Sequence, residues 1–400
     1  MVIPNENRLT FSTSIRKNAL ATANRRHWQN LIERAWGHRN LACLPGVRRV
    51  GKTCLAKSLE DVEYFDCELP RVRRLMQDPQ DFWKGLKGKR VVLDEVHRLD
   101  RPSELLKIAA DHYPSVRVLA TGSSTLGVTS KFRDTLAGRK TDLWLTPMIL
   151  SDLQDFGNTD LRRRLLHGGL PPFFLSKALP ERDFQEWMDA YWARDIQELF
   201  RLERRSSFQK LAELLMTQSG GLFEATSLAR PCGISRPTVV NYLKVLEETF
   251  VVHVVRPFHR RRPKEIVAAP KVYAFDTGFV CYYRGWTGLR HEDLGALWEH
   301  LVLNELYAAT QGRAVGHWRD KQRHEVDFVW APRGRSPLAI ECKWSAEAFG
   351  PGNLHVFRHQ HPAGNNVVVA HDVERSFKRT YGDLIVHFEG LPALIRRVTL

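Results

Sequence analysis

Cysteine is scarce in this 400-residue chain, and its six positions are scattered. No two cysteines form a CxxC pair, which argues against a structural zinc site. Scattered thiols in a chain of this length do not indicate a disulfide framework. No apolar stretch approaches the ~18–20 residues of a membrane-spanning helix, and the N-terminal residues lack the apolar core of a signal peptide. These absences predict a cytoplasmic protein without a membrane segment.

Acidic residues are also comparatively few, because 45 Asp and Glu face 60 Lys and Arg. The net charge of +15 favours a polyanionic partner, nucleic acid before a membrane surface. Hydrophobic residues make up 43% of the chain and charged residues 26%, which argues against a mainly disordered or collagen-like protein. The length predicts roughly two or three domains of ~100–200 residues each.

Short apolar runs alternate with helical stretches in the first 150 residues. The alternation predicts an α/β fold in which crossover helices join the strands of a parallel sheet. A helix is expected first, over residues 14–37. The strands are then predicted at 41–44, 62–67, 91–96, 116–122 and 142–147.

The rest of the chain predicts further helices and strands. Residues 148–200 are expected to be helical with a break at 167–174, and residues 206–258 to form helices followed by a β-rich end. A helix over 295–310 is expected to precede the last strands. These strands are predicted at 324–330, 338–344 and 365–370.

Residues 46–53, GVRRVGKT, have the spacing of a phosphate-binding loop. Glycine tolerates the backbone angles with which the loop turns its N–H groups toward a phosphate. Lys52 would place its charge at the β- and γ-phosphates, and Thr53 would offer a hydroxyl to Mg²⁺. The apolar strand before the loop favours this site over a surface turn with a stray lysine. The predicted nucleotide contacts are Gly46, Val47, Arg48, Arg49, Val50, Gly51, Lys52, Thr53 and Cys54.

The strand predicted at 91–96 ends in two carboxylates, Asp94 and Glu95. Such groups are costly to bury unless a cation or a water uses them. Asp94 is predicted to bind the nucleotide's Mg²⁺, directly or through water, and Glu95 to act as general base on the attacking water. The alternative, a solvated acidic strand end, is disfavoured by the phosphate loop upstream.

Two further segments are candidates for the same site. Thr121-Gly122-Ser123-Ser124 follows a predicted strand, and its hydroxyls, Ser123 among them, would orient the water or sense the γ-phosphate. A Gly-Ser turn is an equally good interpretation. Arg139 would neutralise transition-state charge in a neighbouring subunit as an arginine finger, or be a surface arginine.

Residues 226–250 fit a helix-turn-helix, with a turn at Cys232-Gly233 and a second helix capped by Ser235. Two predicted strands around a basic loop follow and describe the wing of a winged helix. The alternative is a module that packs on the rest of the chain and binds protein. The predicted DNA contacts are Arg236, Thr238, Asn241 and Lys244 on the helix and Arg260, Arg261 and Arg262 in the loop.

Asp327, Glu341 and Lys343 lie in two apolar strands near the C-terminus. Alternate side chains of a strand share a face, so Glu341 and Lys343 point the same way, and a hairpin would bring Asp327 alongside. Two carboxylates would form an oxygen site for Mg²⁺, and the lysine would orient or activate a water for phosphodiester hydrolysis. Glu299, on the preceding helix, would supply a further carboxylate. The alternative is a strand-edge salt bridge between Glu341 and Lys343.

In its motifs and their order, the sequence resembles a family of predicted bacterial and archaeal ATPases of the AAA+ superfamily. The resemblance spans nearly the whole chain and implies a C-terminal domain of the restriction-endonuclease type. One departure is Cys54, where a second threonine is common, although Thr53 still supplies the metal-facing hydroxyl. The motifs are GVRRVGKT (46–53), VVLDEVHRL (91–99), TGSS (121–124), TLAGR (135–139), GGLP (168–171) and YWARDIQEL (191–199).

The expected fold class is therefore α/β: a P-loop NTPase parallel sheet with helices, a winged-helix module and a C-terminal restriction-endonuclease-like α/β domain. The domains are predicted as an ATPase at 1–150, a helical lid or linker at 151–205, a winged helix at 206–285 and a nuclease-like domain at 286–400. The expected cofactors are ATP and Mg²⁺, with Mn²⁺ as an alternative at the nuclease centre.

The leading functional hypothesis is an ATP-dependent enzyme that binds duplex or branched DNA and cleaves it, with no membrane partner. The main alternative is a nucleotide-controlled switch whose nuclease-like domain is a docking platform without cleavage. An RNA-directed enzyme is a third alternative. A homo-oligomer is expected only if Arg139 reaches across an interface.

Overall fold

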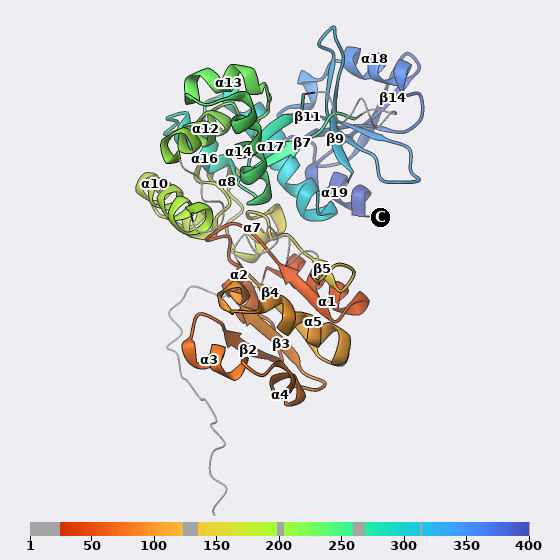
Figure 1. Cartoon of the computed structure of the whole chain (residues 1–400). Coiled ribbons are helices and arrows are strands. Elements are labelled where there is room, and N and C mark those ends of the chain that lie inside the picture. Colours follow the sequence, from red (N-terminus) through yellow and green to blue (C-terminus); the bar gives the residue numbers. More distant parts are fainter. Residues whose placement is uncertain (1–24, 123–134, 198–203, 259–268, 313, 400) are drawn as a thin grey trace, which may run out of the picture.

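The computed structural model describes residues 25–122, 135–197, 204–258, 269–312 and 314–399 (Figure 1). Its N-terminal part is a five-stranded parallel sheet in the order β2-β3-β4-β1-β5. The strands are β1 (Leu41–Leu44), β2 (Val62–Asp66), β3 (Arg90–Asp94), β4 (Arg117–Thr121) and β5 (Lys140–Asp142). The α/β fold class with a parallel sheet is thus confirmed.

Helices cover both faces of this sheet, and its inner strands β1, β3 and β4 are accordingly buried on both sides over most of their length. One face packs with Val72, Trp83 and Leu105 into a core confined to this part of the chain. The helices of the N-terminal part are α1 (Arg26–His38), α2 (Lys52–Lys57), α3 (Pro70–Leu75), α4 (Pro79–Lys84) and α5 (Pro102–His112).

The fifth strand differs from the prediction of 142–147, because β5 ends at Asp142. Leu143 and Leu145 still donate backbone N–H groups to Cys43 and Pro45, at 2.8 and 2.9 Å. The apolar run therefore continues beside β1 and buries its leucines in the core, but the regular ladder lies just before it. The apolar run thus predicted which residues are buried, but not which residues form the strand.

A helical segment follows, and within the predicted break of 167–174 only residues 168–170 are non-helical, because Pro171–Phe174 form a short helix. Gly168 has a φ of 84°, and a Cβ on Gly169 would lie 2.4 Å from the Arg164 guanidinium. Arg164 in turn forms a fully buried ion pair with Asp276, at 3.1 Å. The helices are α7 (Leu150–Asp155), α8 (Leu161–His167), α9 (Pro171–Phe174), α10 (Glu181–Ala190) and the π-helix η3 (Tyr191–Ile196).

The next part combines helices with a three-stranded antiparallel sheet in the order β6-β8-β7. Gly233 has a φ of 64° and turns the chain between α13 and α14, and Ser235 caps α14 by accepting a hydrogen bond from the Thr238 N–H. This part comprises α12 (Arg205–Thr217), β6 (Gly221–Leu222), α13 (Ala225–Cys232), α14 (Arg236–Glu248), β7 (Val252–Val255), β8 (Lys271–Ala274) and α16 (Thr277–Tyr283).

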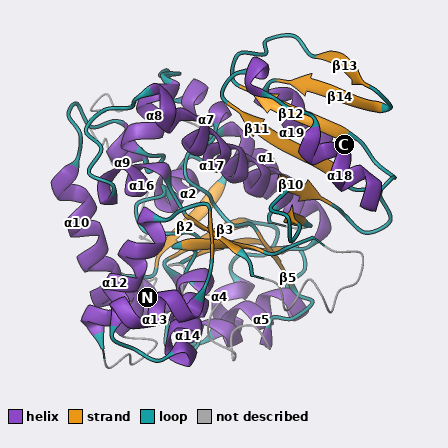
Figure 2. Ribbon diagram, turned by 90° about the horizontal axis from the view of Figure 1, so that it is seen from above, coloured by secondary structure: helices purple, strands orange, loops and turns teal. Residues whose placement is uncertain are grey.

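The C-terminal part is a six-stranded mixed sheet in the order β13-β14-β12-β11-β10-β9, which lies at the upper right in Figure 2. The central pairs β11–β12 and β12–β14 are parallel and the other pairs are antiparallel. Its strands are β9 (Val315–Arg319), β10 (Glu325–Trp330), β11 (Leu338–Lys343), β12 (Asn366–Ala370), β13 (Phe377–Tyr381) and β14 (Leu384–Glu389).

Three helices accompany this sheet, and α17 links it to the rest of the molecule. A single continuous core runs from Leu44 beside α1, through Leu246 of α14 and Leu301 of α17, to Ile340 of β11. No helix in the described ranges is long and apolar enough to span a membrane. The helices are α17 (His291–Thr310), α18 (Gly352–Gln360) and α19 (Leu391–Thr399).

Candidate functional site

The predicted phosphate loop connects the carboxyl end of β1 to α2. Gly46 is needed there, because a Cβ would lie 2.8 Å from the Leu145 carbonyl oxygen. Gly51 has a φ of 101°. The buried Lys52 ammonium donates to the carbonyls of Gly46 and Val47, at 2.8 and 3.0 Å. The loop thus curls around its own lysine.

The two predicted acids lie at the end of β3, two strands away from β1 in the same sheet. Asp94 is buried and accepts hydrogen bonds from the hydroxyls of Thr121 and Tyr64. Glu95 has a φ of 54°, a strained conformation for a non-glycine residue that is common at functional sites. Its carboxylate lies 3.2 Å from His97 Nδ1. Burial opposes ionisation of Glu95, but His97 and Lys52 together lower its pKa.

These acids and hydroxyls suit a hard cation. Thr53 and Asp94 offer oxygen atoms, the donors that Mg²⁺ prefers. Asp94 already accepts one hydroxyl at each carboxylate oxygen, so water-mediated binding fits it better than direct coordination. The donor set therefore fits the Mg²⁺ that the sequence predicts.

The other nucleotide-site candidates have mixed outcomes. Thr121 lies between the two acids, donating to Asp94 and accepting from the Glu95 N–H at 3.1 Å. Ser123 lies outside the described residues. Arg139 precedes β5, level with the start of β1, and pairs with Asp111 at 2.7 Å. Within one chain, Arg139 therefore lies at the amino ends of these strands, whereas the phosphate loop lies at their carboxyl ends. A role of Arg139 across an interface stays a prediction.

Sequence reasoning missed a third acid beside the phosphate loop, Asp195 of the π-helix. Its carboxylate is buried and lies 3.8 Å from the Arg48 guanidinium. Burial raises the pKa of Asp195 to about 6, and Arg48 and Lys52 oppose that shift. The stretch YWARDIQEL was noticed as a motif, but nothing in it indicated that it folds back onto residues 46–53.

The predicted DNA-contact residues on α14 mostly face solvent. Arg236, Asn241 and Lys244 are exposed, whereas Thr238 is half-buried and shares a hydrogen bond with the Ser235 hydroxyl at 2.8 Å. Lys244 also lies 4.0 Å from Glu248. The three loop candidates, Arg260, Arg261 and Arg262, lie outside the described residues.

The C-terminal candidates do meet on one face of the β10–β11 hairpin. Phe328 of β10 pairs with Ile340 of β11, which places Asp327 beside Glu341. Asp327 accepts the Cys342 N–H at 2.7 Å. Lys343 donates to Glu341 at 2.9 Å and lies 3.7 Å from Asp327. The predicted trio is therefore assembled, with the salt bridge of the alternative interpretation also present.

Glu299 joins this cluster, but it is held by residues of another sheet. The Tyr273 hydroxyl donates to it at 2.5 Å and the buried Lys271 ammonium at 3.2 Å. Lys271 also forms an ion pair with Glu325. Burial and the neighbouring Asp327 raise the pKa of Glu299, although Lys271 opposes the shift.

The three predicted carboxylates are not arranged as one metal site. Among the described residues, no group of three or more His, Cys, Asp or Glu side chains is placed to hold a metal ion. One observation nevertheless fits a cation between Asp327 and Glu341. The buried Glu341 Oε1 lacks a hydrogen-bond partner, and burial with Asp327 beside it raises the pKa of Glu341 to about 8. A two-carboxylate site therefore fits the structure, and Glu299 as a third ligand does not.

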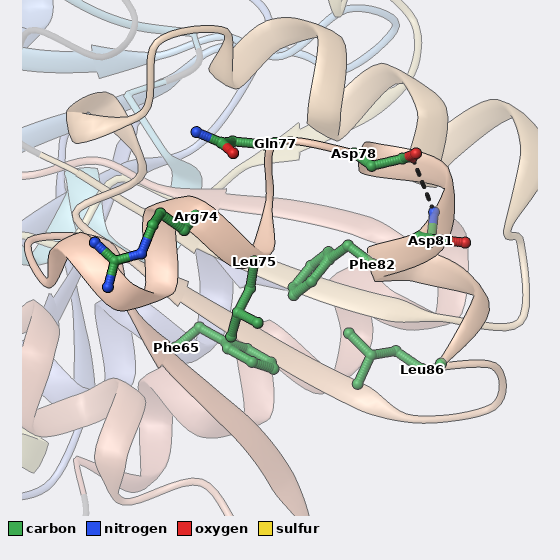
Figure 3. Close-up of a pocket in the computed structure, with 9 residues that line it drawn as sticks. Phe65, Arg74, Leu75, Gln77, Asp78, Asp81, Phe82 and Leu86 are labelled. Atoms are coloured by element: carbon green, nitrogen blue, oxygen red, sulfur yellow. Dashed lines mark hydrogen bonds between the residues drawn. The ribbon is translucent and has the colours of Figure 1, made fainter.

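A hollow of about 580 Å³ lies between β2, α3 and α4, away from both centres (Figure 3). Phe65, Leu75, Phe82 and Leu86 line it with apolar surface, and Arg74 lies at its side. No residue predicted to bind or to react lines this hollow.

Three family models match successive parts of the chain. Residues 38–154 match a family model described as an AAA domain, and this range includes the parallel sheet. Residues 158–290 and 294–388 match two domains of unknown function (DUF8612 and DUF4143). Neither match supports the restriction-endonuclease-type assignment.

Two relatives of the chain are themselves uncharacterized, so they do not assign a function to it. An uncharacterized protein, Rv2008c of Mycobacterium tuberculosis, is 29% identical over 325 residues, covering 78% of this chain and 72% of its own. The uncharacterized protein Mb2031c of Mycobacterium bovis matches with the same figures.

Among solved structures, a DNA replication initiation factor is 15% identical and covers 50% of this chain and 70% of its own, with a TM-score of 0.25. The DNA clamp loader delta protein of Bacillus subtilis is 12% identical and covers 70% and 98%, with a TM-score of 0.26. Such scores carry no functional argument.

Proposed function

We propose that this chain is an ATP-dependent DNA-processing enzyme. The observation that carries the ATPase part is the placement of Lys52 inside the loop 46–53 with Asp94 and Glu95 at the end of a strand in the same sheet. A buried ammonium bound only by carbonyls in its loop is well placed to exchange them for phosphate oxygens.

The residues of the chain divide the work of hydrolysis. Lys52 contacts the β- and γ-phosphates, and Thr53 and Asp94 hold the magnesium ion that neutralises phosphate charge when it is bound. Glu95, kept ionised by its neighbours, accepts the proton of the attacking water. Thr121 fixes the relative positions of both acids.

DNA binding is assigned to α14 and the adjacent wing. The exposed Arg236, Asn241 and Lys244 supply the groups that meet phosphates and base edges. A helix with an αL turn before it and an antiparallel sheet behind it supports this assignment, as does the chain's charge of +15. We propose domain limits at residues 150, 205 and 285, as the sequence indicates.

DNA cleavage is assigned to Asp327, Glu341 and Lys343. The two carboxylates would hold Mg²⁺ or Mn²⁺, and Lys343 would orient a water toward the phosphodiester. The unpartnered Glu341 Oε1 supports this part of the proposal.

Two assays test the parts separately. In the first, Lys52→Ala should abolish ATP binding or turnover, and Glu95→Gln should bind ATP without hydrolysing it. In the second, wild type, Asp327→Ala and Lys343→Ala are compared on duplex and branched DNA with Mg²⁺ or Mn²⁺, with and without ATP. Equal cutting by all three proteins would remove the nuclease assignment, and a matched RNA duplex as competitor tests the choice of nucleic acid.

One observation favours a second function, a nucleotide-controlled switch without cleavage. Lys271 and Lys343 already neutralise the carboxylates of the C-terminal cluster, as they would in a cluster that only stabilises the fold. ATP turnover by wild type together with no cutting of any substrate would support the switch. Sizing of the protein with and without ATP, in wild type and Arg139→Ala, tests whether Arg139 acts within an oligomer.

A further inference from the structure

The helical segment formed by α10 and η3, which follows the residues that match the AAA domain, contacts the phosphate loop directly. Trp187 of α10 donates its indole N–H to the Arg48 carbonyl at 3.0 Å, and Asp183 pairs with Arg49 at 3.3 Å. Asp195 approaches Arg48 from the π-helix. Contacts at positions 183, 187 and 195 thus come from one side of a continuous helical segment.

The π-helix explains why Asp195 still faces the loop. In an α-helix, residues four apart advance by more than one turn, so a contact face drifts around the axis. The wider turn of η3 (Tyr191–Ile196) opposes that drift, and π-turns of this kind are frequent at functional sites. Tyr191 stacks on Trp187 with ring centroids 5.5 Å apart, which keeps the segment packed against the loop.

Asp195 brings an unused acceptor into the nucleotide centre. Its side chain is 3% exposed, and its Oδ2 atom has no hydrogen-bond partner. Arg48, at 3.8 Å, is beyond hydrogen-bond range. A buried carboxylate oxygen without a partner is costly, so its retention calls for a ligand that donates a hydrogen bond.

The surroundings of Asp195 indicate which donor this is. The charged groups that act on it are Arg48 and Lys52 of the phosphate loop and His97 and Glu95 beyond β3. The mechanism above assigns the γ-phosphate to Lys52 and the attacking water to Glu95, and both of these groups act electrostatically on Asp195. A fully ionised γ-phosphate has no proton to donate to a carboxylate, whereas a water has.

We infer that Asp195 orients the attacking water, together with Glu95, an inference that rests on the proposed ATPase activity. The water forms a bond to the γ-phosphorus as the bond to the β–γ bridging oxygen breaks, and ADP leaves with that bond's electron pair. The water's proton goes to Glu95, while Asp195 accepts a hydrogen bond and stays ionised. The Arg48 guanidinium, 3.8 Å away, offsets the negative charge of the Asp195 carboxylate.

The test compares two identical substitutions on one helical segment. Asp195→Asn should lower kcat by about 10²-fold, because a positioned group at the reacting water contributes on that order. It should change KM and the affinity for a fluorescent ATP analogue by less than about threefold, since Asp195 does not hold the phosphates. Asp189→Asn is the control, because Asp189 pairs with Arg205 on the exposed side of the segment and should leave kcat unchanged.

Other outcomes separate this inference from its premise. An unchanged kcat in Asp195→Asn would overturn it while leaving the ATPase in place. A parallel loss of nucleotide affinity and thermal stability would also overturn it, because a purely structural role predicts that loss. If wild type hydrolyses ATP no faster than Lys52→Ala, the proposed function itself fails, and the inference falls with it.

Discussion

The lysines of the nucleotide centre and of the C-terminal carboxylate cluster have different kinds of partner. In the N-terminal sheet, Lys52 donates to two backbone carbonyls. In the C-terminal sheet, Lys271 and Lys343 face carboxylates. A cation bound by neutral carbonyls keeps its charge available to an anionic ligand, whereas a cation paired with carboxylates has been neutralised within the fold. The first arrangement is typical of a binding site. The second stabilises the fold, or it is a site at which a metal ion would compete with the lysines for the carboxylates.

The two centres also differ in how many sheets build them. Asp94 and Glu95 lie at the carboxyl end of β3, and Lys52 begins α2 after the loop that follows β1 of the same parallel sheet, the usual position of ligand sites in open α/β folds. The C-terminal cluster takes Glu299 from α17, Asp327 and Glu341 from β10 and β11, and Lys271 from β8 of a different sheet. Its integrity therefore depends on packing between two sheets.

The largest expected effect concerns Lys271, whose removal would break the second arrangement. Lys271→Met leaves Glu299 and Glu325 without their buried cation and should lower the free energy of unfolding by about 3–5 kcal/mol. Urea unfolding followed by tryptophan fluorescence measures this. Lys244→Met, at an exposed position on α14, is the control and should change it by less than about 0.5 kcal/mol. A small effect of Lys271→Met would mean that the carboxylates are not compensated as the structure indicates.

Next in size is the contrast between the two lysines in ATP turnover. Lys52→Ala should lower the steady-state ATPase rate by about 10²–10³-fold, because it removes a preorganised charge at the transferring phosphate. Lys343→Ala should leave that rate within about twofold, since it belongs to the other centre. Comparable losses in both variants would show that the two centres are not independent.

A third test concerns Glu305, a buried acid whose close partner is a backbone amide and not a cation. It accepts the Leu150 N–H at 2.5 Å, and burial raises its pKa to about 7. Between about pH 4.5 and 7 the folded state therefore keeps a proton on Glu305, whereas the unfolded state releases it. The free energy of unfolding should consequently fall as the pH rises through that window.

Replacement of this acid should remove that contribution to the pH dependence. Glu305→Gln should gain stability relative to wild type by about 1.4 kcal/mol for each pH unit within the window. Thermal melts of both proteins from pH 4.5 to 8 measure it, with the exposed Glu292→Gln on the same helix as control. Parallel curves for wild type and Glu305→Gln would contradict the raised pKa.

The smallest expected effect lies outside both centres, at the exposed face of α14. Lys244→Ala should weaken binding to duplex DNA only a few-fold, because one phosphate contact is lost. The slope of log K against log salt should fall by about 0.9. Fluorescence anisotropy at several salt concentrations tests this, and an unchanged slope would remove Lys244 from the DNA interface.

Much of the nucleotide centre could be predicted from the sequence, because its residues are close together in the chain or follow strands of one sheet. Residues 46–53 and the pair Asp94–Glu95 needed only local patterns. Asp195 could not be found in this way, because it is about 140 residues from the loop, and its burial beside Arg48 depends on how α10 and η3 pack. The strand β5 was misplaced because apolar content predicts burial better than it predicts the exact hydrogen-bonded residues.

The C-terminal cluster shows the same division. Spacing alone placed Glu341 and Lys343 on one face of a strand, since side chains alternate along any strand. The position of Lys271 and Tyr273 against Glu299 required the tertiary structure, because β8 and α17 meet only when the domains pack. The sequence by itself determined which chemical groups and local folds are present, through short-range periodicity and turn geometry. Only the tertiary structure decided which charges compensate one another, because electrostatic pairing depends on distance in space and on burial.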